Sequence, residues 1–138
     1  MAEGKLDAVG VVVSDLGRSV RFYRGLGAPF PEGAEASEPG HAEAALPSGL
    51  RLMLDTEEEM HRFDPGWRRP AGAPAVSLAF RCEGPAGVDD LFARALEMGG
   101  TGYKEPWDAF WGQRYAQVRD PDGNGVDLYA DLDRPDGG

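Results

Sequence analysis

The opening residues of the chain change from strand-like to helix-like spacing of hydrophobic positions. Residues 6–13 form a β-branched run, which predicts a strand. Ser14 and Asp15 then offer a helix N-cap, and hydrophobic residues recur at helical spacing as far as Leu26. Gly27 ends this helix. The chain is therefore expected to begin with a strand followed by a helix.

A hairpin and a short helix are predicted next. Residues 28–41 are rich in Pro, Gly, Ala and Glu, and they predict a loop. Residues 41–46 and 50–55 alternate between hydrophobic and polar positions around a Pro-Ser-Gly turn, which predicts a β-hairpin. Thr56 with Glu59 matches a capping box that opens a short helix.

The same order of elements returns in the second half of the chain. Residues 75–82 predict a strand, and residues 85–98 predict a helix that a Gly-Gly pair ends. The segment after this helix is interpreted as a loop. Strands are then predicted at about 114–119 and 126–130, joined by a polar turn.

We expect one domain, residues 1–138, built from two related modules, because this length suits a single ordinary domain. The first module spans about 5–55 and the second about 74–131. A linker occupies about 56–73, and a flexible tail is expected at 132–138. The repeated order of strand, helix and strands makes internal duplication a reasonable hypothesis.

Charge and composition exclude several classes of protein. The net charge of −10 argues against a nucleic-acid surface or an anionic membrane, since both require clustered positive charge. A hydrophobic content of 41% is enough to build a core. The lone Cys82 excludes an intrachain disulfide and a CxxC site. Neither an N-terminal hydrophobic signal nor an apolar stretch of about 18 residues is present, so a cytoplasmic protein is expected.

Two motifs at opposite ends of the chain resemble the vicinal oxygen chelate superfamily, which comprises glyoxalases, bleomycin resistance proteins and extradiol dioxygenases. They are Ser14-Asp15-Leu16, Ser19-Val20 and Phe22-Tyr23 with Leu26-Gly27, and then Trp111-Gly112-Gln113-Arg114-Tyr115 through Asp120-Pro121-Asp122-Gly123-Asn124 to Val126-Asp127-Leu128. The resemblance implies an α+β fold of two βαβββ modules, whose curved half-barrel sheets surround a cavity. It also implies a homodimer.

The resemblance further implies where a divalent metal would be held. The family's enzymes use four side chains on the first and last strands of each module, and these positions match Ala8, Met53, Ser77 and Asp127. Only Asp127 is a credible ligand, and one carboxylate cannot hold zinc, iron, nickel or manganese tightly. Neither of the two His residues lies at such a position. We therefore predict no metal site and no cofactor.

The segment 103–115 carries five aromatic side chains, which two interpretations explain. It is a core or dimer-contact cluster, or it is a stacking wall for a flat or apolar ligand. If Asp127 faces a cavity, Tyr129 should face it as well, because alternate residues of a strand share a face. The residues that we expect to contact a ligand are Met53, Trp107, Phe110, Trp111, Tyr115, Asp127 and Tyr129.

The turn before the last predicted strand has a second interpretation. Asp120, Asp122 and Asn124, with Asp131 at the twelfth place, match part of a calcium-binding loop. Asp and Asn are also typical of tight turns, and the flanking segments alternate like strands rather than helices. The sequence favours a hairpin turn.

Three functions are compatible with these features. The first is a metal-independent small-molecule binding protein of the bleomycin-resistance type, which sequesters an aromatic or cationic compound such as an antibiotic. The second is a glyoxalase- or dioxygenase-like lyase or isomerase with a non-standard metal site, or with Asp127 as a general base. The third is an accessory or regulatory dimer in which the aromatic segment contacts protein. We expect a small-molecule ligand and a homodimer, with no nucleic-acid or membrane partner.

Overall fold

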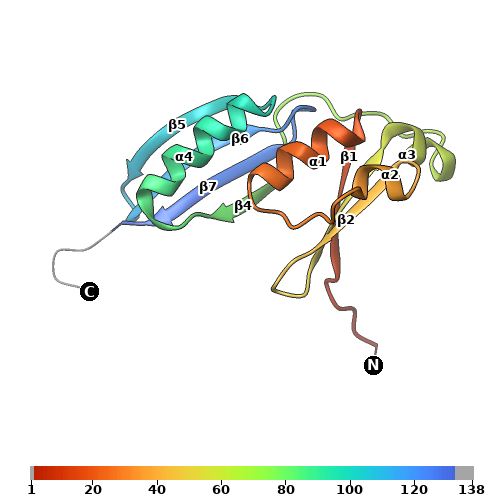
Figure 1. The fold of residues 1–138 in the computed structure, drawn as a ribbon, viewed down its shortest axis with the longest axis horizontal. Helices are drawn as coiled ribbons and strands as arrows, with labels where there is room; N and C mark the ends of the chain where they lie inside the picture. Colours follow the sequence, from red (N-terminus) through yellow and green to blue (C-terminus); the bar gives the residue numbers. More distant parts are fainter. Residues whose placement is uncertain (1, 133–138) are drawn as a thin grey trace. The chain divides into compact units, whose positions relative to one another are not determined.

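The computed structural model describes residues 2–132 and contains two compact units, Met1–Pro70 and Ala71–Gly138 (Figure 1). Each unit has its own sheet and helices, and each is considered by itself. Apart from Leu132, the tail predicted to be flexible lies outside the described residues.

The first unit is a three-stranded sheet with helices around it. Its elements are β1 (Ala8–Val13), α1 (Leu16–Gly25), α2 (Ala34–Ser37), β2 (His41–Ala45), β3 (Arg51–Thr56) and α3 (Glu57–Phe63). The strand order is β1-β3-β2, with β1 and β3 parallel and β2 and β3 antiparallel. The buried side chains of this unit include Val20, Phe22 and Tyr23 on α1, and Leu52 and Leu54 on β3. This core forms because helical spacing on α1 and alternation on β3 gather their apolar residues on one face of each element.

The two helix starts predicted in this unit are confirmed by their caps. The Asp15 carboxylate accepts a hydrogen bond from the Arg18 amide at 3.0 Å, and Thr56 Oγ1 accepts one from the Glu59 amide at 3.1 Å. These side chains satisfy amide groups that the first turn of a helix leaves without partners.

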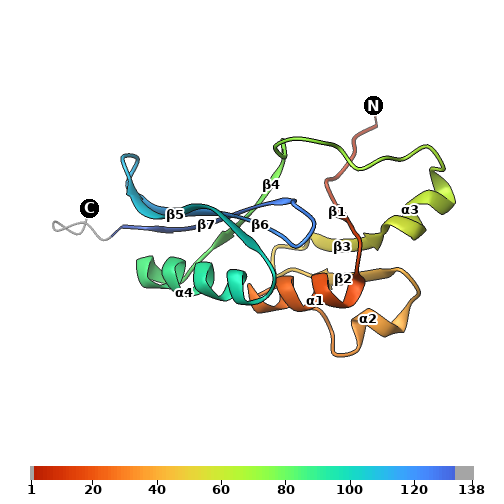
Figure 2. The ribbon, with the colours of Figure 1, turned by 90° about the horizontal axis from the view of Figure 1, so that it is seen from above.

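The second unit is a four-stranded sheet with one long helix. Its elements are β4 (Ser77–Arg81), α4 (Gly84–Glu97), β5 (Thr101–Ala109), β6 (Gln113–Arg119) and β7 (Gly125–Asp131). The strand order is β4-β7-β6-β5, with β4 and β7 parallel and the other pairs antiparallel. Helix α4 runs along one face of the sheet, as two perpendicular views show (Figures 1 and 2). Val88, Val118, Val126 and Leu128 are fully or almost fully buried in this unit.

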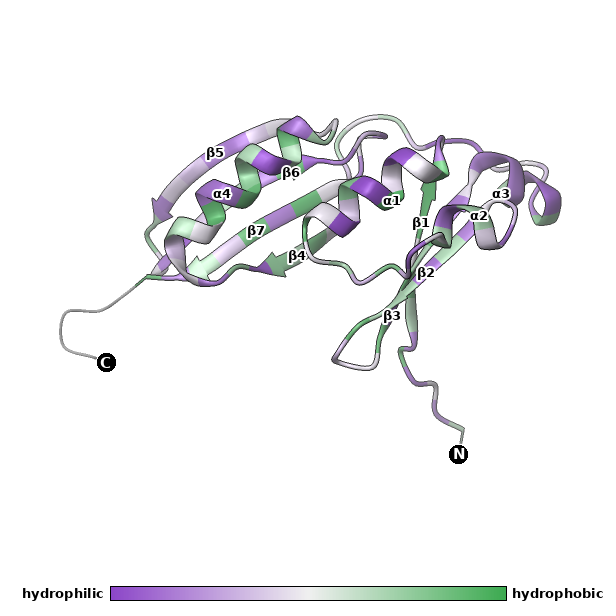
Figure 3. Cartoon of the chain, viewed as in Figure 1, coloured by the Kyte–Doolittle hydropathy of each residue, from purple (hydrophilic) through white to green (hydrophobic). Residues whose placement is uncertain are grey.

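The predicted loop after α4 is wrong, because residues 101–109 form the edge strand β5. This strand pairs with β6, and its register shifts between Gly102 and Lys104 and again between Lys104 and Trp107. Pro106 lies within the second irregularity, where an edge strand tolerates a missing amide donor. The strand is largely hydrophilic, in contrast to the hydrophobic β1 (Figure 3). The segment therefore lacks the alternation that identifies a half-buried strand.

The α+β class with two open curved sheets is confirmed, but the βαβββ pattern holds only for the second unit. The first unit has three strands, and residues 28–40 contain the short helix α2 in place of a fourth. This stretch contains three Pro residues and two Gly residues, which weaken strand pairing.

The central strand pairs of the two units have the same register. Gly10 of β1 pairs with Met53 of β3, and Ala79 of β4 pairs with Asp127 of β7. Met53 and Asp127 therefore occupy equivalent places in their own sheets. Within residues 2–132, none of the helices has the length and apolar character needed to cross a membrane.

Candidate functional site

Most of the expected ligand-contacting residues lie in the second unit, on the sheet face opposite α4. Arg114 points toward α4, where its guanidinium bonds the Asp89 carboxylate at 2.9 Å. Its neighbours along β6, Tyr115 and Gln113, therefore point to the other face. Across β6 and β7 that face carries the pairs Gln113–Asp131, Tyr115–Tyr129, Gln117–Asp127 and Arg119–Gly125.

Asp127 lies in the middle of this face and accepts hydrogen bonds from two neutral groups. The Tyr115 hydroxyl donates to Oδ2, and Gln117 Nε2 donates to Oδ1 at 3.4 Å. Burial, reinforced by the hydrogen bond to Asp127 and by its negative charge, raises the pKa of Tyr115 to about 12. Tyr115 therefore stays protonated at neutral pH and serves as a donor. Asp127 has no ion pair among the described residues.

Aromatic rings form a continuous group beside Asp127. Tyr115 and Tyr129 are stacked with ring centroids 6.4 Å apart, and Trp111 meets the Tyr115 ring edge-on at 5.4 Å. Trp107 and Phe110 pack edge-on against Trp111 at 5.6 and 4.9 Å. Phe110 is 90% exposed and Trp111 46% exposed, so the interpretation of these two rings as core residues is wrong. These two rings therefore form either a stacking wall for a ligand or a contact surface for a second protein chain.

Two cations lie over rings at the ends of this group. The Arg81 guanidinium is 4.9 Å from the Tyr129 centroid and also pairs with Asp131 at 3.1 Å. Lys104 Nζ is 4.9 Å from the Trp107 centroid. Cation–π attraction holds both groups against aromatic faces. Such contacts show that these faces are able to accept a positive group.

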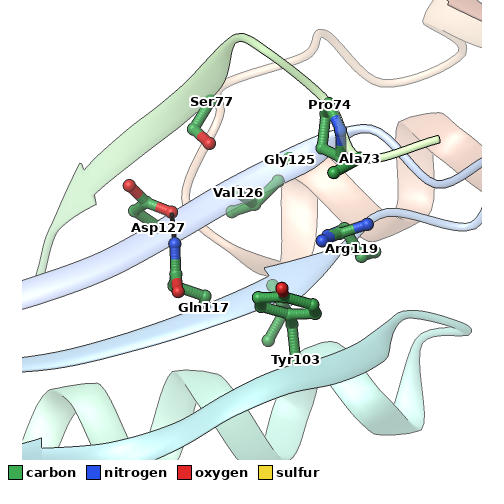
Figure 4. A pocket seen from close by; sticks show the side chains of 10 residues that line it. Ala73, Pro74, Ser77, Tyr103, Gln117, Arg119, Gly125, Val126 and Asp127 are labelled. Carbon is green, nitrogen blue, oxygen red and sulfur yellow. Dashed lines mark hydrogen bonds between the residues drawn. The ribbon is translucent and has the colours of Figure 1, made fainter.

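A cavity of about 160 Å³ adjoins Asp127 (Figure 4), and neither Tyr115 nor Tyr129 lines it. Its lining comes from the start of the second unit and from β4, β5, β6 and β7, and consists of Ala73, Pro74, Ser77, Tyr103, Gln117, Val118, Arg119, Gly125, Val126 and Asp127. The Arg119 guanidinium lies over the Tyr103 ring, 4.1 Å from its centroid. The cavity therefore has a carboxylate and a guanidinium in its wall.

The turn between β6 and β7 is closed by the Asp120 side chain. Its Oδ1 accepts hydrogen bonds from the amides of Asp122 and Asn124 at 2.8 and 2.9 Å, and its Oδ2 accepts one from Asn124 Nδ2 at 2.8 Å. These bonds are typical of an Asx turn. No group of three or more His, Cys, Asp or Glu suited to a metal occurs within residues 2–132, which favours the hairpin-turn interpretation over the calcium loop.

The residues at the family's metal positions do not fit a divalent metal. In the second unit, Ser77 offers an un-ionised hydroxyl, and the oxygens of Asp127 already accept hydrogen bonds. In the first unit, Ala8 has no donor atom and Met53 offers a thioether, which is a soft ligand. Met53 lies half-buried on β3 beside Gly10, and its contact with a ligand stays a prediction.

Sequence reasoning missed Gln117, Arg119 and Arg81 as members of the site. Strand alternation offered a signal for the first two, since Tyr115, Gln117 and Arg119 are spaced by two along β6. Arg81 lies opposite Tyr129 in the parallel pair of β4 and β7, and only the register brings the two together.

A cluster of charges on the first sheet was also missed. His41 Nδ1 lies 2.7 Å from Asp55 Oδ1 and Nε2 lies 2.8 Å from Glu43 Oε2, while Arg51 bonds Glu43 at 3.1 Å and Asp7 at 2.7 Å. Burial lowers the pKa of His41, but the hydrogen bonds and charges of the two carboxylates outweigh it, and the net pKa is raised. The cluster joins three carboxylates to two basic groups, so these side chains are engaged with one another within the first unit.

The geometry thus defines an open, curved-sheet α+β protein with an acidic and aromatic sheet face. The model of the Glyoxalase/Bleomycin resistance protein/Dioxygenase superfamily matches residues 5–128, and the chain belongs to this superfamily. The resemblance in the sequence is thereby confirmed. Among curated proteins, a sequence search gives no significant match.

Solved structures with the same fold come from several bacteria. A glyoxalase/bleomycin resistance protein/dioxygenase family enzyme from Burkholderia phytofirmans PsJN has a TM-score of 0.78 at 18% identity, over 94% of this chain and 100% of that one. A glyoxalase-related enzyme from Fulvimarina pelagi has a TM-score of 0.77 at 20% identity, over 92% and 88%. A glyoxalase/bleomycin resistance protein from Albidiferax ferrireducens T118 has a TM-score of 0.65 at 26% identity, over 90% and 97%.

Proposed function

We propose that this protein binds and sequesters a small aromatic or cationic compound, such as an antibiotic, without a metal or a cofactor, in the manner of bleomycin resistance proteins. The observation that carries the proposal is Asp127, an uncompensated carboxylate set among aromatic rings on one sheet face. Sequestration requires tight binding and enough protein, and it needs no reacting group. Membership of the superfamily supports a small-molecule ligand.

Asp127 suits a cationic group on the ligand. Its two donors are neutral, so within the described residues no cation offsets the charge of the carboxylate that a ligand ammonium would approach. A charge-assisted hydrogen bond is stronger than a neutral one. The net charge of −10 also raises the local concentration of cations.

The rings beside Asp127 suit a flat or apolar body attached to that cation. Among the described residues, no cation lies over Tyr115 or Trp111, in contrast to Tyr129 and Trp107. A planar ligand gains offset-stacked or edge-on contacts of about 0.5–1.5 kcal/mol per ring pair beyond its area burial. Aromatic contact and the carboxylate therefore act on two parts of one molecule.

The enzymatic alternative requires Asp127 to take up a proton. Both of its oxygens already accept hydrogen bonds, from the Tyr115 hydroxyl and from Gln117 Nε2. A general base needs a lone pair within reach of the substrate proton, and each oxygen of Asp127 accepts one hydrogen bond and keeps a further lone pair. That lone pair serves a ligand ammonium or a substrate proton equally, so recovery of the compound is the experiment that separates the two functions.

The exposed rings of the β5–β6 turn favour a second role, in dimer contact. Phe110 has 90% of its surface exposed, and aromatic residues are enriched in protein interfaces. We propose that the protein is a cytoplasmic homodimer and that its two units form one domain. Phe110→Ala and Trp111→Ala are expected to convert the dimer to a monomer in light scattering at fixed concentration. A wild-type monomer would contradict the proposed dimer.

The binding role is tested with 2-phenylethylamine as the probe, by calorimetry at low ionic strength. Asp127→Asn removes the charge and keeps the shape, and we expect it to weaken binding by about tenfold or more. Asp90→Asn on the exposed surface of α4 is the matched control and should bind like the wild type. Equal binding by the wild type and Asp127→Asn would refute the proposed site.

Sequestration and catalysis are separated by recovering the compound. After incubation with excess protein and denaturation, chromatography should return the probe unchanged. A product that forms with the wild type and disappears with Asp127→Asn would instead assign the enzymatic alternative.

A further inference from the structure

The cavity beside Asp127 contains two opposite charges that do not pair. Arg119 and Asp127 both line it, and no ion pair joins them within residues 2–132. The Arg119 guanidinium lies over the Tyr103 ring face, 4.1 Å from the centroid, and it has no carboxylate partner in the described part of the chain. A cation held over a ring, beside an uncompensated carboxylate, leaves two charges available to one occupant of the cavity.

Strand register places these two residues on neighbouring strands of one sheet face. Gln117 pairs with Asp127 and Arg119 pairs with Gly125, so Arg119 lies diagonally from Asp127 on the neighbouring strand. Diagonal neighbours on one face of an antiparallel pair are about 7–8 Å apart at the backbone. Asp127 and Arg119 thus lie in adjacent rows of one sheet face, a spacing that suits one small group lying between their side chains.

The cavity is small and largely polar. Its volume of about 160 Å³ is enough for several water molecules or one small polar group. Gly125 has no side chain, which makes room for Ser77 and Pro74. A Cβ at this position would lie 2.6 Å from Ser77 Oγ and 3.2 Å from Pro74 Cγ. The Ser77 hydroxyl can therefore enter the wall of the cavity, where Figure 4 shows it on the same side as Asp127. A group of about five heavy atoms with hydrogen-bonding capacity fits this space.

We propose that this cavity binds the zwitterionic head of an α-amino-acid-type ligand, with its ammonium at Asp127 and its carboxylate at Arg119. An ammonium, one carbon and a carboxylate amount to five heavy atoms with opposite charges at their ends. The rest of the ligand extends along the sheet from Asp127 to Tyr115 and Tyr129, since these rows are adjacent on β6 and β7. This inference rests on the proposed function, because it assumes that a ligand occupies the Asp127 face.

Arg119 is the residue that distinguishes a zwitterion from a simple cation. Its planar guanidinium donates two parallel hydrogen bonds to a carboxylate, and stacking on Tyr103 restricts its orientation. A ligand that has only an ammonium group leaves Arg119 without a partner. The ratio of the two affinities therefore reports the role of this side chain.

The experiment compares three probes by calorimetry: L-phenylalanine, 2-phenylethylamine, which lacks the carboxylate, and 3-phenylpropionate, which lacks the ammonium. We expect wild-type protein to bind L-phenylalanine about 10- to 100-fold more tightly than either analogue. Arg119→Gln should remove the preference over 2-phenylethylamine and leave the affinity for that amine within a factor of about two. Arg119→Lys, which keeps the charge without the planar fork, should have an intermediate preference.

Arg94→Gln is the matched control, because it removes the same charge from an exposed position on α4. Thermal unfolding of Arg119→Gln and Arg119→Lys establishes that both variants fold before their affinities are compared. The zwitterion proposal would be overturned if the wild type bound L-phenylalanine and 2-phenylethylamine with equal affinity, or if the preference for L-phenylalanine survived Arg119→Gln. The proposed function would still stand in that case, provided that Asp127→Asn weakens the binding of 2-phenylethylamine. Tight binding of 3-phenylpropionate that Asp127→Asn does not change would overturn the zwitterion and the cationic ligand together. Absence of binding by all three probes would also overturn both.

Discussion

The stability of the second unit should depend on Asp120, a carboxylate that is only 2% exposed. It accepts three hydrogen bonds, from the amides of Asp122 and Asn124 and from the Asn124 side chain, at 2.8, 2.9 and 2.8 Å. Asp120→Ala removes both acceptor oxygens, and with them all three of these bonds. The turn that these bonds close leads directly into β7, the strand of Asp127.

The magnitude follows from the strength of charge-assisted hydrogen bonds. Each such bond contributes about 1.5–3 kcal/mol, and the contributions of three bonds to one carboxylate are not additive. The amides left behind are partly exposed, so water replaces some of the lost contacts, and the cost of burying the carboxylate disappears. We expect a net loss of about 2–4 kcal/mol in the free energy of unfolding.

Urea denaturation of the full chain, followed by tryptophan fluorescence, measures this loss. Asp120→Asn keeps an acceptor for the two backbone amides and should lose about 1 kcal/mol. Asp90→Ala on the exposed surface of α4 is the control, expected within about 0.5 kcal/mol of the wild type. If Asp120→Ala were as stable as this control, the turn would not depend on these bonds. A calcium-dependent rise of the unfolding temperature that Asp120→Ala abolishes would instead favour the calcium loop.

Three further predictions follow from the pKa shifts. Because the pKa of His41 is raised in the folded protein, the stability that its charge contributes is complete below about pH 6.5 and is lost as pH rises through the higher folded pKa. The urea midpoints of the wild type and His41→Gln should therefore converge between about pH 6 and pH 8. A constant difference would contradict the ion pairs of His41. Tyr115 should ionise near pH 12, so Tyr115→Phe should remove a step in tyrosinate absorbance at that pH. Loss of a step near about pH 10 instead would show that the hydrogen bond to Asp127 does not hold the proton on the Tyr115 hydroxyl. Burial raises the pKa of the Cys82 thiol, so a disulfide reagent should react slowly with the native protein and quickly with the protein unfolded in urea. A fast reaction of the native protein would place the thiol at the surface.

Local signals in the sequence were sufficient for most of the elements. The caps at Asp15 and Thr56 work through side chains that bond amides within the same turn, so three or four neighbouring residues define them. The strand β7 carries strict alternation, with Val126, Leu128 and Ala130 buried. Such periodicity depends on the element itself, and this is why these predictions are confirmed.

The strand β5 and the cavity depend on partners that are distant in sequence. Residues 101–109 pair with β6 despite Gly102 and Pro106, because β6 offers free backbone groups at its edge. Arg119 meets Tyr103 only when that pairing forms, since the two residues are brought together across the β5–β6 hairpin. No local pattern contains this information.

Equivalent positions of the two sheets place the acids Asp55 and Asp127 in different surroundings. On the first sheet, the acid Asp55 faces His41 across the strands, and its carboxylate lies 2.7 Å from the imidazole Nδ1. On the second sheet, the equivalent cross-strand pair is Tyr115 and Tyr129, and the acid lies one row further on, at Asp127.

This displacement of the acid has an electrostatic consequence. At Asp127 the neighbours are a phenol and an amide, which orient the carboxylate without cancelling its charge. A carboxylate without a cation partner, partly removed from water, is stabilised further by any cation that enters. The charged side chains of the first sheet therefore contact one another within its hairpin, whereas the Asp127 carboxylate of the second sheet lies beside aromatic rings without an ion pair among the described residues. The difference lies in which residues stand at matching strand positions, and it locates the expected binding energy in the second unit.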